Sequence, residues 1–333
     1  MENMHYSIQK LLKLTSLGAI GLIAATGLAA AQDNYPSQPI KIIVGYAPGG
    51  NVDVPARLFA PELSKILGVP VVIENRPGAS GVPAAEMVMR TKPDGYTLIW
   101  GTSASHSVSV VAMAPLSFDP VKDFAPVTLI SRDGNVIVAH PSFPATDLKA
   151  FVEYVKANPR TPIGTSGPAT SGRFAVELMK PKLGIELKVV PYRSAGPLLV
   201  DVVGGHVPLG ILGASTAVPL IKEGKIKAIA VTSISKSKVL PELPTFDESV
   251  SKGFEAVAWS ALYAPPGTPD AIVAKVNAAM KQVSQLPAIK KWFDDSGLDV
   301  PMGSPKELTE FMKDDIQKWV QVAKDNNLKI DPQ

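Results

Sequence analysis

The chain has 333 residues, enough for two domains of ordinary size and at least one large hydrophobic core. Its 33 basic and 30 acidic side chains nearly balance, and no basic run of the kind that follows a phosphate backbone occurs, so we expect no nucleic-acid partner. There is no cysteine, which excludes disulfides, zinc-thiolate sites, iron–sulfur clusters and thiol nucleophiles.

Residues 1–31 have the pattern of a secretory signal peptide. Lys10 and Lys13 precede an uncharged, largely apolar run that ends in three alanines, the last of which is Ala31. A transmembrane anchor is the alternative, but a spanning helix needs about 20 strongly apolar residues, and threonine, serine and glycine interrupt this run. We therefore predict cleavage after Ala31 and a mature protein in the periplasm.

Short β-rich apolar runs alternate with helical patterns along most of the mature chain, which predicts an α/β fold. The predicted strands cover residues 40–46, 69–74, 97–101, 126–130, 136–139, 187–191, 207–212 and 226–231. The predicted helices between them cover residues 54–67, 84–90, 148–158, 172–183, 195–203 and 216–223. Thr146 and Asp147 provide a helix N-cap signal before the third of these helices.

The C-terminal part of the chain has a different pattern. A proline-rich segment, residues 264–269, ends the alternation, and two long amphipathic helices are predicted near residues 271–285 and 306–325. Two acidic pairs, Asp294-Asp295 and Asp314-Asp315, fall in this region. Adjacent residues of a helix point about 100° apart, and we expect all four carboxylates to be solvated surface charges.

Two successive α/β arrays followed by a helical tail indicate two lobes, with the tail returning to the first lobe. The predicted boundaries are residues 32–132 with 257–333 for lobe 1, residues 133–256 for lobe 2, and crossings near residues 132–135 and 254–258. In open α/β sheets ligands bind at the carboxyl ends of strands, so the loops that follow the strands are the candidate binding loops.

The first of these loops, residues 46–53, contains Gly49 and Gly50, which permit close approach of a ligand to the backbone. Asp53 stands four residues before Arg57, so a capped helix with a local ion pair is the alternative interpretation of these two charges.

The second loop, residues 164–173, holds four hydroxyl residues and three glycines before a predicted helix, which indicates a neutral nest for an anion. An ordinary hydroxyl-rich N-cap turn is the alternative. The loops at residues 78–81, 101–106 and 192–197 follow the same logic, and each is equally consistent with a plain turn.

No recognisable catalytic or metal-binding motif occurs. The serine loops at residues 78–81 and 164–167 miss the G-x-S-x-G elbow, because the second glycine comes one residue too soon. The three histidines of the mature chain are widely separated and match no metal motif, although His106 is a candidate for lining the cleft. We therefore predict no catalytic residue, no metal and no cofactor.

An ordered set of motifs runs through the mature chain. It comprises Tyr35-Pro36-Ser37-Gln38-Pro39, Ala47-Pro48-Gly49-Gly50, Glu74-Asn75-Arg76-Pro77-Gly78, Pro93-Asp94-Gly95-Tyr96, Phe118-Asp119-Pro120, Leu243-Pro244-Thr245 and Ala264-Pro265-Pro266-Gly267. In this order the motifs resemble the Bug/TctC family, the extracytoplasmic solute receptors of tripartite tricarboxylate transporters. The resemblance implies a two-lobed periplasmic binding fold of type II-like organisation, with two crossings and a helical C-terminal tail packed on lobe 1.

The resemblance also implies a ligand-binding site without catalytic activity. It places the ligand, usually a carboxylate, between residues of two loops: Tyr46, Pro48, Gly49, Gly50 and Asp53 on one lobe, and Ser166, Gly167, Thr170 and Ser171 on the other. The remaining loops add Ser80, Thr102, Ser103, Arg193, Gly196 and Ser215 as ligand-binding candidates. The segment 212–215 is smaller and more apolar than is usual in the family, which favours a roomier pocket for an aromatic or aliphatic acid.

We predict a monomeric periplasmic receptor that captures a small organic carboxylate, of dicarboxylate, aromatic or amino acid type, through loop amides, hydroxyls and water. Its expected partners are the ligand and the integral membrane subunits of a tripartite tricarboxylate transporter. A ligand-sensing partner of a membrane signalling system is the alternative, and a secreted hydrolase is a weaker one, since no motif supplies a general base.

Overall fold

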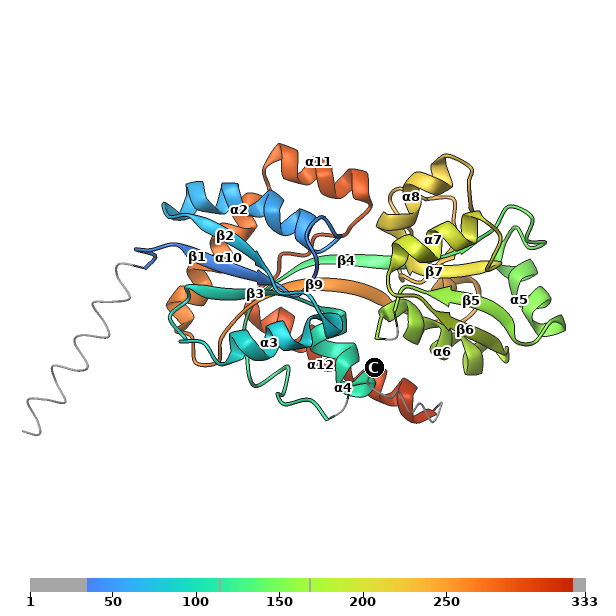
Figure 1. Ribbon diagram of the computed structural model, residues 1–333, viewed down its shortest axis with the longest axis horizontal. Helices are drawn as coiled ribbons and strands as arrows, with labels where there is room; N and C mark the ends of the chain where they lie inside the picture. The colour runs from blue at the N-terminus through green and yellow to red at the C-terminus, as the bar shows by residue number, and fades with distance from the viewer. Residues whose placement is uncertain (1–34, 114, 168, 326–333) are drawn as a thin grey trace, which may run out of the picture.

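The computed structural model describes residues 35–113, 115–167 and 169–325 (Figure 1). The predicted signal peptide and its cleavage site therefore lie outside the described residues. None of the described helices is both long enough and apolar enough to cross a membrane.

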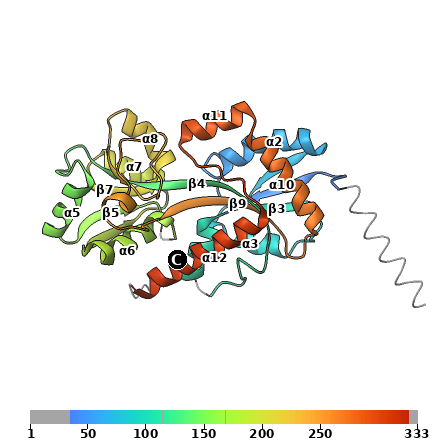
Figure 2. The same ribbon diagram turned by 180° about the vertical axis from the view of Figure 1, so that it is seen from behind.

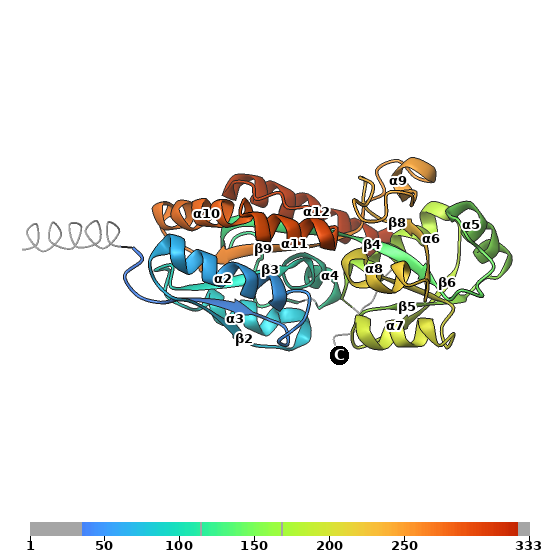
Figure 3. The ribbon, with the colours of Figure 1, turned by 90° about the horizontal axis from the view of Figure 1, so that it is seen from above.

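Two α/β lobes lie side by side and are joined by two long strands, as Figures 1 and 3 show. In lobe 1 the strand order is β2-β1-β3-β9-β4, in which β1, β2 and β3 are parallel and β9 is antiparallel to both neighbours. These strands are β1 (Ile40–Val44), β2 (Val71–Asn75), β3 (Thr97–Thr102), β4 (Ala125–Ala139) and β9 (Val257–Ala264).

Helices cover both faces of the lobe 1 sheet. One face carries α2 (Asp53–Leu67), α10 (Asp270–Ser284) and α11 (Pro287–Ser296), and the other carries α3 (Val82–Met89), α4 (Ser109–Ala112) and α12 (Pro305–Asp325). On the first face Phe59 packs edge-to-face against Trp100 at 5.7 Å and against Phe293 at 6.0 Å between ring centroids. Each such aromatic pair adds about 0.5–1.5 kcal/mol beyond area burial, which fixes α2 on the sheet below the first binding loop.

Like the sheet of lobe 1, the sheet of lobe 2 contains three parallel strands. The order is β4-β7-β5-β6, and β8 pairs with β4 on its other edge. The strands are β5 (Thr161–Thr165), β6 (Leu187–Pro191), β7 (Leu209–Gly213) and β8 (Lys227–Val231), and the helices are α5 (Leu148–Ala157), α6 (Ser171–Leu183), α7 (Ala195–Val203), α8 (Ala214–Lys222) and α9 (Phe246–Ser249). The predicted N-cap is confirmed, since Asp147 Oδ1 accepts a hydrogen bond from Ala150 N–H at 2.9 Å.

The crossings between the lobes are strands and not loops. The two strands predicted at residues 126–130 and 136–139 are the ends of one 15-residue strand, β4, so their separation was wrong. Polar residues between the two apolar ends hid this continuity in the sequence. Residues 257–264 form a second crossing strand, β9, which pairs with both β3 and β4 and was not predicted from the sequence. Strand β5 was missed because Pro162 and Gly164 weaken its strand pattern.

The C-terminal helix α12 packs on lobe 1 and also reaches lobe 2 (Figure 2). Its Leu308 and Met312 lie in the lobe 1 core, whereas Trp319 packs edge-to-face against Phe174 of α6, with 5.6 Å between ring centroids. A third contact between the lobes therefore accompanies the two crossing strands.

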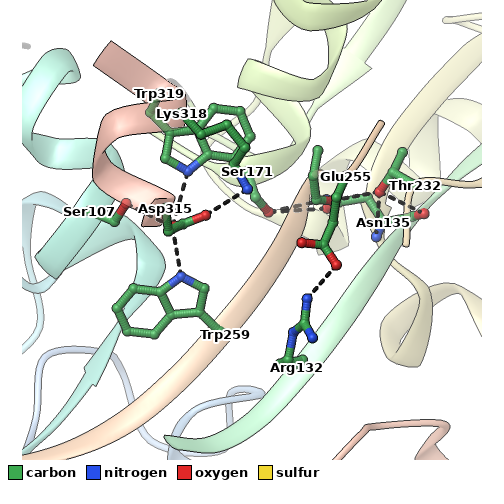
Figure 4. Close-up of polar contacts among 11 residues, drawn as sticks. Ser107, Arg132, Asn135, Ser171, Thr232, Glu255, Trp259, Asp315, Lys318 and Trp319 are labelled. Atoms are coloured by element: carbon green, nitrogen blue, oxygen red, sulfur yellow. Dashed lines mark hydrogen bonds and ion pairs between the residues drawn. The ribbon is translucent and has the colours of Figure 1, made fainter. Parts of the chain in front are cut away.

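One acidic pair on α12 is not the pair of surface charges that we expected. Asp314 is exposed, but Asp315 is 3% exposed and accepts hydrogen bonds from Trp259, Trp319 and Ser107 (Figure 4). The 100° step between adjacent helical residues turns Asp314 to solvent and Asp315 toward the sheet. The expectation was wrong for Asp315 because two of the donors to its carboxylate, Ser107 and Trp259, come from distant parts of the chain.

Candidate functional site

The candidate binding loops leave the sheet at the carboxyl ends of parallel strands in each lobe. The loops after β1, β2 and β3 share one edge of lobe 1, and the loops after β5, β6 and β7 share one edge of lobe 2. The prediction that these loops lie together required their strands to be parallel, and the parallel pairing is confirmed.

Asp53 holds the shape of the first loop. Its Oδ2 accepts hydrogen bonds from Gly49 N–H and Arg57 Nε, both at 2.8 Å, and its Oδ1 accepts one from Asn75 Nδ2 at 2.7 Å. These bonds hold the pKa of the carboxyl below its usual value against the opposing effect of burial. The predicted ion pair with Arg57 is confirmed. Because Asp53 is 1% exposed, the structure shows it shaping the loop, and a direct ligand contact by Asp53 stays a prediction.

The loop that Asp53 supports presents its backbone outward. Pro48 and Gly49 are exposed and Gly50 is half-buried. Gly49 has a φ of +79°, in the left-handed region that glycine favours, and the space where a Cβ would stand is open. This part of the loop can therefore bring main-chain groups to a ligand.

Three predicted site residues of lobe 1 meet around the Tyr46 hydroxyl. It donates to the Ser80 carbonyl oxygen at 2.9 Å and lies 2.8 Å from Thr102 Oγ1. Burial raises the pKa of Tyr46 to about 12, so the phenol remains protonated in the physiological pH range. The Ser80 hydroxyl makes no hydrogen bond to any described residue, which leaves it available to a ligand.

The hydroxyl groups of the second loop differ in their hydrogen bonding: some stabilise the local structure, and one is free. Thr170 caps α6, since its Oγ1 accepts from Arg173 N–H at 3.2 Å and donates to the Gly167 carbonyl oxygen at 3.1 Å. Ser171 is buried against Asn135. The Ser166 hydroxyl is half-buried and has no hydrogen-bond partner among the described residues. The N-cap interpretation thus holds for Thr170, and Ser166 is the donor that the loop leaves free.

The other predicted residues lie at the ends of further strands. Ser103 is buried directly after β3, while Arg193 and Gly196 are exposed at the start of α7. His106 does not line the loops: it is fully buried, stacks on Tyr263 with 4.5 Å between ring centroids, and packs against Phe124. Burial lowers its pKa to about 3, so it is a neutral core histidine.

A polar stripe on the crossing strand β4, formed by Ser131, Asp133 and Asn135, connects the loops of both lobes. Alternate residues of a strand share a face, so these three side chains point the same way. None of the three was predicted from the sequence as a site residue. The signal that could have revealed them is the run of residues 131–135, which has no apolar side chain, between two apolar segments of one strand.

Each residue of the polar stripe contacts a different part of the site. Ser131 Oγ lies 2.8 Å from Ser260 Oγ, and Ser260 pairs with the predicted site residue Thr102 in the sheet. Asp133 Oδ2 accepts a hydrogen bond from Ser215 Oγ at 2.6 Å. Asn135 Nδ2 donates to Ser171 Oγ at 3.2 Å (Figure 4). Predicted site residues of both lobes, Thr102 from lobe 1 with Ser171 and Ser215 from lobe 2, therefore converge on the crossing strands.

Asp133 is the titratable member of the stripe. Burial raises its pKa to about 6, and hydrogen bonds from Ser215 Oγ and from the N–H groups of Ala214 and Ser215 only partly oppose this. Its charge therefore changes just below neutral pH, next to groups predicted to hold a carboxylate.

We expect the affinity for a carboxylate ligand to rise as the pH falls from about 7.5 to about 5. Protonation of Asp133 removes a negative charge that opposes the ligand, and an effect of roughly threefold to tenfold corresponds to about 0.7–1.4 kcal/mol. Titration calorimetry with a ligand that stays ionised above pH 5 measures it. Asp133→Asn should flatten the pH profile, and an equally steep profile in that variant would contradict the assignment.

Among the described residues one buried serine lies close to a histidine, but the third group of a catalytic triad is missing. Ser105 Oγ lies 2.7 Å from His106 Nδ1, but His106 Nε2 has no hydrogen-bond partner among the described residues, so no carboxylate orients the ring. Nor do three or more His, Asp or Glu side chains of the described ranges gather where they could hold a metal ion.

The chain is similar in sequence to the receptors of one family. The sequence model of the family described as "Tripartite tricarboxylate transporter family receptor" matches residues 55–328. Protein BugT of Bordetella pertussis is 31% identical over 319 residues, which cover 94% of this chain and 98% of BugT.

Two solved structures with bound ligands are similar in fold and sequence. MatC from Rhodopseudomonas palustris, with bound malate, is 34% identical, with a TM-score of 0.77 over 86% of this chain and 99% of MatC. A second R. palustris protein, Rpa4515 with adipate, is 32% identical, with a TM-score of 0.80 over 88% of this chain and 98% of the Rpa4515 chain.

Proposed function

Because this chain belongs to the tripartite tricarboxylate transporter family of receptors, we propose that it binds a small organic carboxylate in the periplasm and delivers it to the membrane subunits of such a transporter. The observation that carries the proposal is the position of the polar stripe Ser131, Asp133 and Asn135 between the two lobes. It contacts Ser171 and Ser215 of lobe 2 directly, and on the lobe 1 side it contacts Ser260, the sheet partner of Thr102. A ligand enclosed there contacts both lobes at once.

The chemistry of the loops favours an anion held by neutral donors. The free hydroxyls of Ser80 and Ser166, the exposed backbone around Gly49 and the N-terminus of α6 stabilise a carboxylate without a buried counterion. The desolvation cost of a buried ion pair is avoided, which keeps ligand release feasible. Malate and adipate, named with the similar structures, are dicarboxylates and support this ligand class.

Closure of the lobes is the step that links binding to transport in this proposal. The crossing strands β4 and β9 are the hinge, with lobe 1 formed by residues 32–132 and 257–333 and lobe 2 by residues 133–256. A ligand that touches both lobes favours the closed state, which presents a different outer surface to the membrane subunits.

A thermal-shift screen of the exported protein, unfolded and refolded to remove co-purified ligand, tests the proposal. The compounds are dicarboxylates, tricarboxylates, acidic amino acids and aromatic acids, each with its amide as a control. A ligand at 100 times its dissociation constant adds about 2.7 kcal/mol to the free energy of unfolding and raises the melting temperature visibly. The proposal of a carboxylate receptor would be refuted if no acid raised the melting temperature, or if each acid and its amide raised it equally.

Two hydroxyl variants locate the site within the same experiment. Ser166→Ala should weaken ligand binding by at least about tenfold, since a hydrogen bond to a charged group is worth about 1.5–3 kcal/mol, and should leave the ligand-free melting temperature unchanged. Thr170→Ala should instead lower the free energy of unfolding by about 1 kcal/mol, because it removes the cap of α6. Unchanged affinity in Ser166→Ala would remove this residue from the site.

A further inference from the structure

Asp133 differs from every other buried carboxylate that the structure describes. These carboxylates belong to Asp53, Asp133, Glu177, Asp247 and Asp315. Each of the others forms an ion pair with a lysine or arginine three to five residues later in the chain. Asp133 forms none with any described residue. Because buried charges in folded proteins are nearly always paired, Asp133 is suited to a cation that comes from outside the chain.

The groups that contact Asp133 are all neutral. Its Oδ2 accepts a hydrogen bond from Ser215 Oγ at 2.6 Å, and its carboxylate also accepts from the N–H groups of Ser215 and Ala214 at the start of α8. A Cβ on Gly213 would lie 2.5 Å from Oδ2, so the glycine leaves room for the carboxylate. On β9, Ala258 stands opposite Asp133. A carboxylate has about four acceptor positions, and these three donors leave one of them open.

Asp133 lies in the middle of the polar stripe that joins the two lobes. Before it on β4, Ser131 reaches Ser260 on the lobe 1 side. After it, Asn135 reaches Ser171 of lobe 2. Asp133 is 8% exposed, compared with 1% for the loop-shaping Asp53. A ligand that bridges the lobes along the stripe therefore meets one negative charge among neutral hydroxyl and amide groups.

On the basis of the proposed carboxylate site, we propose that the ligand also carries a cationic group, as an amino acid does, and that Asp133 binds its ammonium. An ammonium group has three N–H donors, so it can bond to Asp133 and to neighbouring oxygens of the stripe at once. The carboxylate of the ligand stays with the hydroxyl and backbone donors of the binding loops. A dicarboxylate would instead place a second negative charge near Asp133 and bind more weakly.

The direction of the pH dependence then differs between the two kinds of ligand. For an acid without a cationic group, affinity rises as Asp133 becomes protonated, as described above. For an amino acid, affinity falls over the same range, because the protonated carboxyl no longer attracts the ammonium group. The described residues that contact Asp133 from β7, β9 and α8 include no titratable side chain.

Titration calorimetry at pH 7.5 with matched compounds tests the proposal on the exported protein. The probes are the standard α-amino acids and the unbranched ω-amino acids from glycine to 6-aminohexanoate. Each is compared with the acid of the same carbon chain that lacks the amino group, such as alanine with propionate, aspartate with succinate and 4-aminobutyrate with butyrate. We expect at least one amino acid to bind at least about tenfold more tightly than its matched acid.

A charge-removing variant assigns the preference to Asp133. Asp133→Asn keeps the size of the side chain and an acceptor oxygen for Ser215. The preferred amino acid should lose at least about tenfold in affinity, and the matched acid should bind no more weakly than before. Asp314→Asn makes the same change at an exposed position of α12 and should alter neither affinity. Melting temperatures without ligand show whether each variant is folded.

The possible outcomes separate this inference from the proposed function. Equal binding of every amino acid and its matched acid by the unmodified protein would overturn the inference and leave the carboxylate receptor intact. Equal losses for amino acid and matched acid in a folded Asp133→Asn variant would do the same. Absence of binding by all these compounds and by the acids of the thermal-shift screen would overturn the proposed function, and this inference with it.

Discussion

Replacing Asp315 with alanine should lower the free energy of unfolding by about 3–5 kcal/mol. Its Oδ2 accepts hydrogen bonds from Trp259 Nε1 at 2.8 Å, Ser107 Oγ at 2.8 Å and Trp319 Nε1 at 3.1 Å. Its Oδ1 lies 2.7 Å from Lys318 Nζ. Removal of the carboxylate leaves three buried donors without an acceptor and a partly buried ammonium without its partner. Urea unfolding followed by tryptophan fluorescence measures the change.

The neighbouring residue provides a matched control for Asp315. Asp314→Ala removes the same group from the same helix at an exposed position, and surface substitutions of this kind usually change stability by less than about 0.5 kcal/mol. Equal effects of the two substitutions would show that Asp315 is not the buried acceptor described above.

The same cluster connects the stability of α12 with the binding site. Asp315 holds Trp319, and Trp319 packs against Phe174 of α6, the helix whose first turn carries Ser171. Loss of the carboxylate should therefore also loosen the position of α6 relative to lobe 1.

Replacing Gly49 with valine should weaken carboxylate binding by at least about tenfold. A β-branched residue is strongly disfavoured at a φ of +79°, so the loop must change its shape or carry the strain. The new side chain would also occupy the open space through which the ligand approaches the backbone. Calorimetry with the acid identified in the thermal-shift screen measures the loss.

Gly267→Val is the control that separates the effect of backbone strain on stability from the effect of Gly49→Val on ligand binding. Gly267 has a φ of +80° and equally open surroundings, but it lies in the loop after β9 and belongs to none of the predicted binding loops. Both variants should lose similar stability, and only Gly49→Val should lose affinity. Unchanged ligand affinity in Gly49→Val would refute the assignment of the first loop.

The site could be predicted from the sequence only in part. The glycines of the first loop and the hydroxyls of the second were visible as local patterns, and so were the Asp53–Arg57 spacing and the cap before α5. The sequence did not show which hydroxyl of the second loop caps a helix and which is free. A serine or threonine just before a helix can be a cap, as Thr170 is, or a free donor, as Ser166 is.

By itself the sequence determined the elements whose signals are local: the helix at residues 195–203, the parallel strands other than β5, and the ordered motifs that identify the family. Only the tertiary structure decided that β4 runs unbroken through both lobes, that its polar stripe contacts Ser260, Ser171 and Ser215, and that Asp315 is buried. The physical reason is that these features depend on partners far away in the chain. A polar residue in a strand, or a carboxylate on a helix, takes the same local form whether water or a distant donor satisfies it.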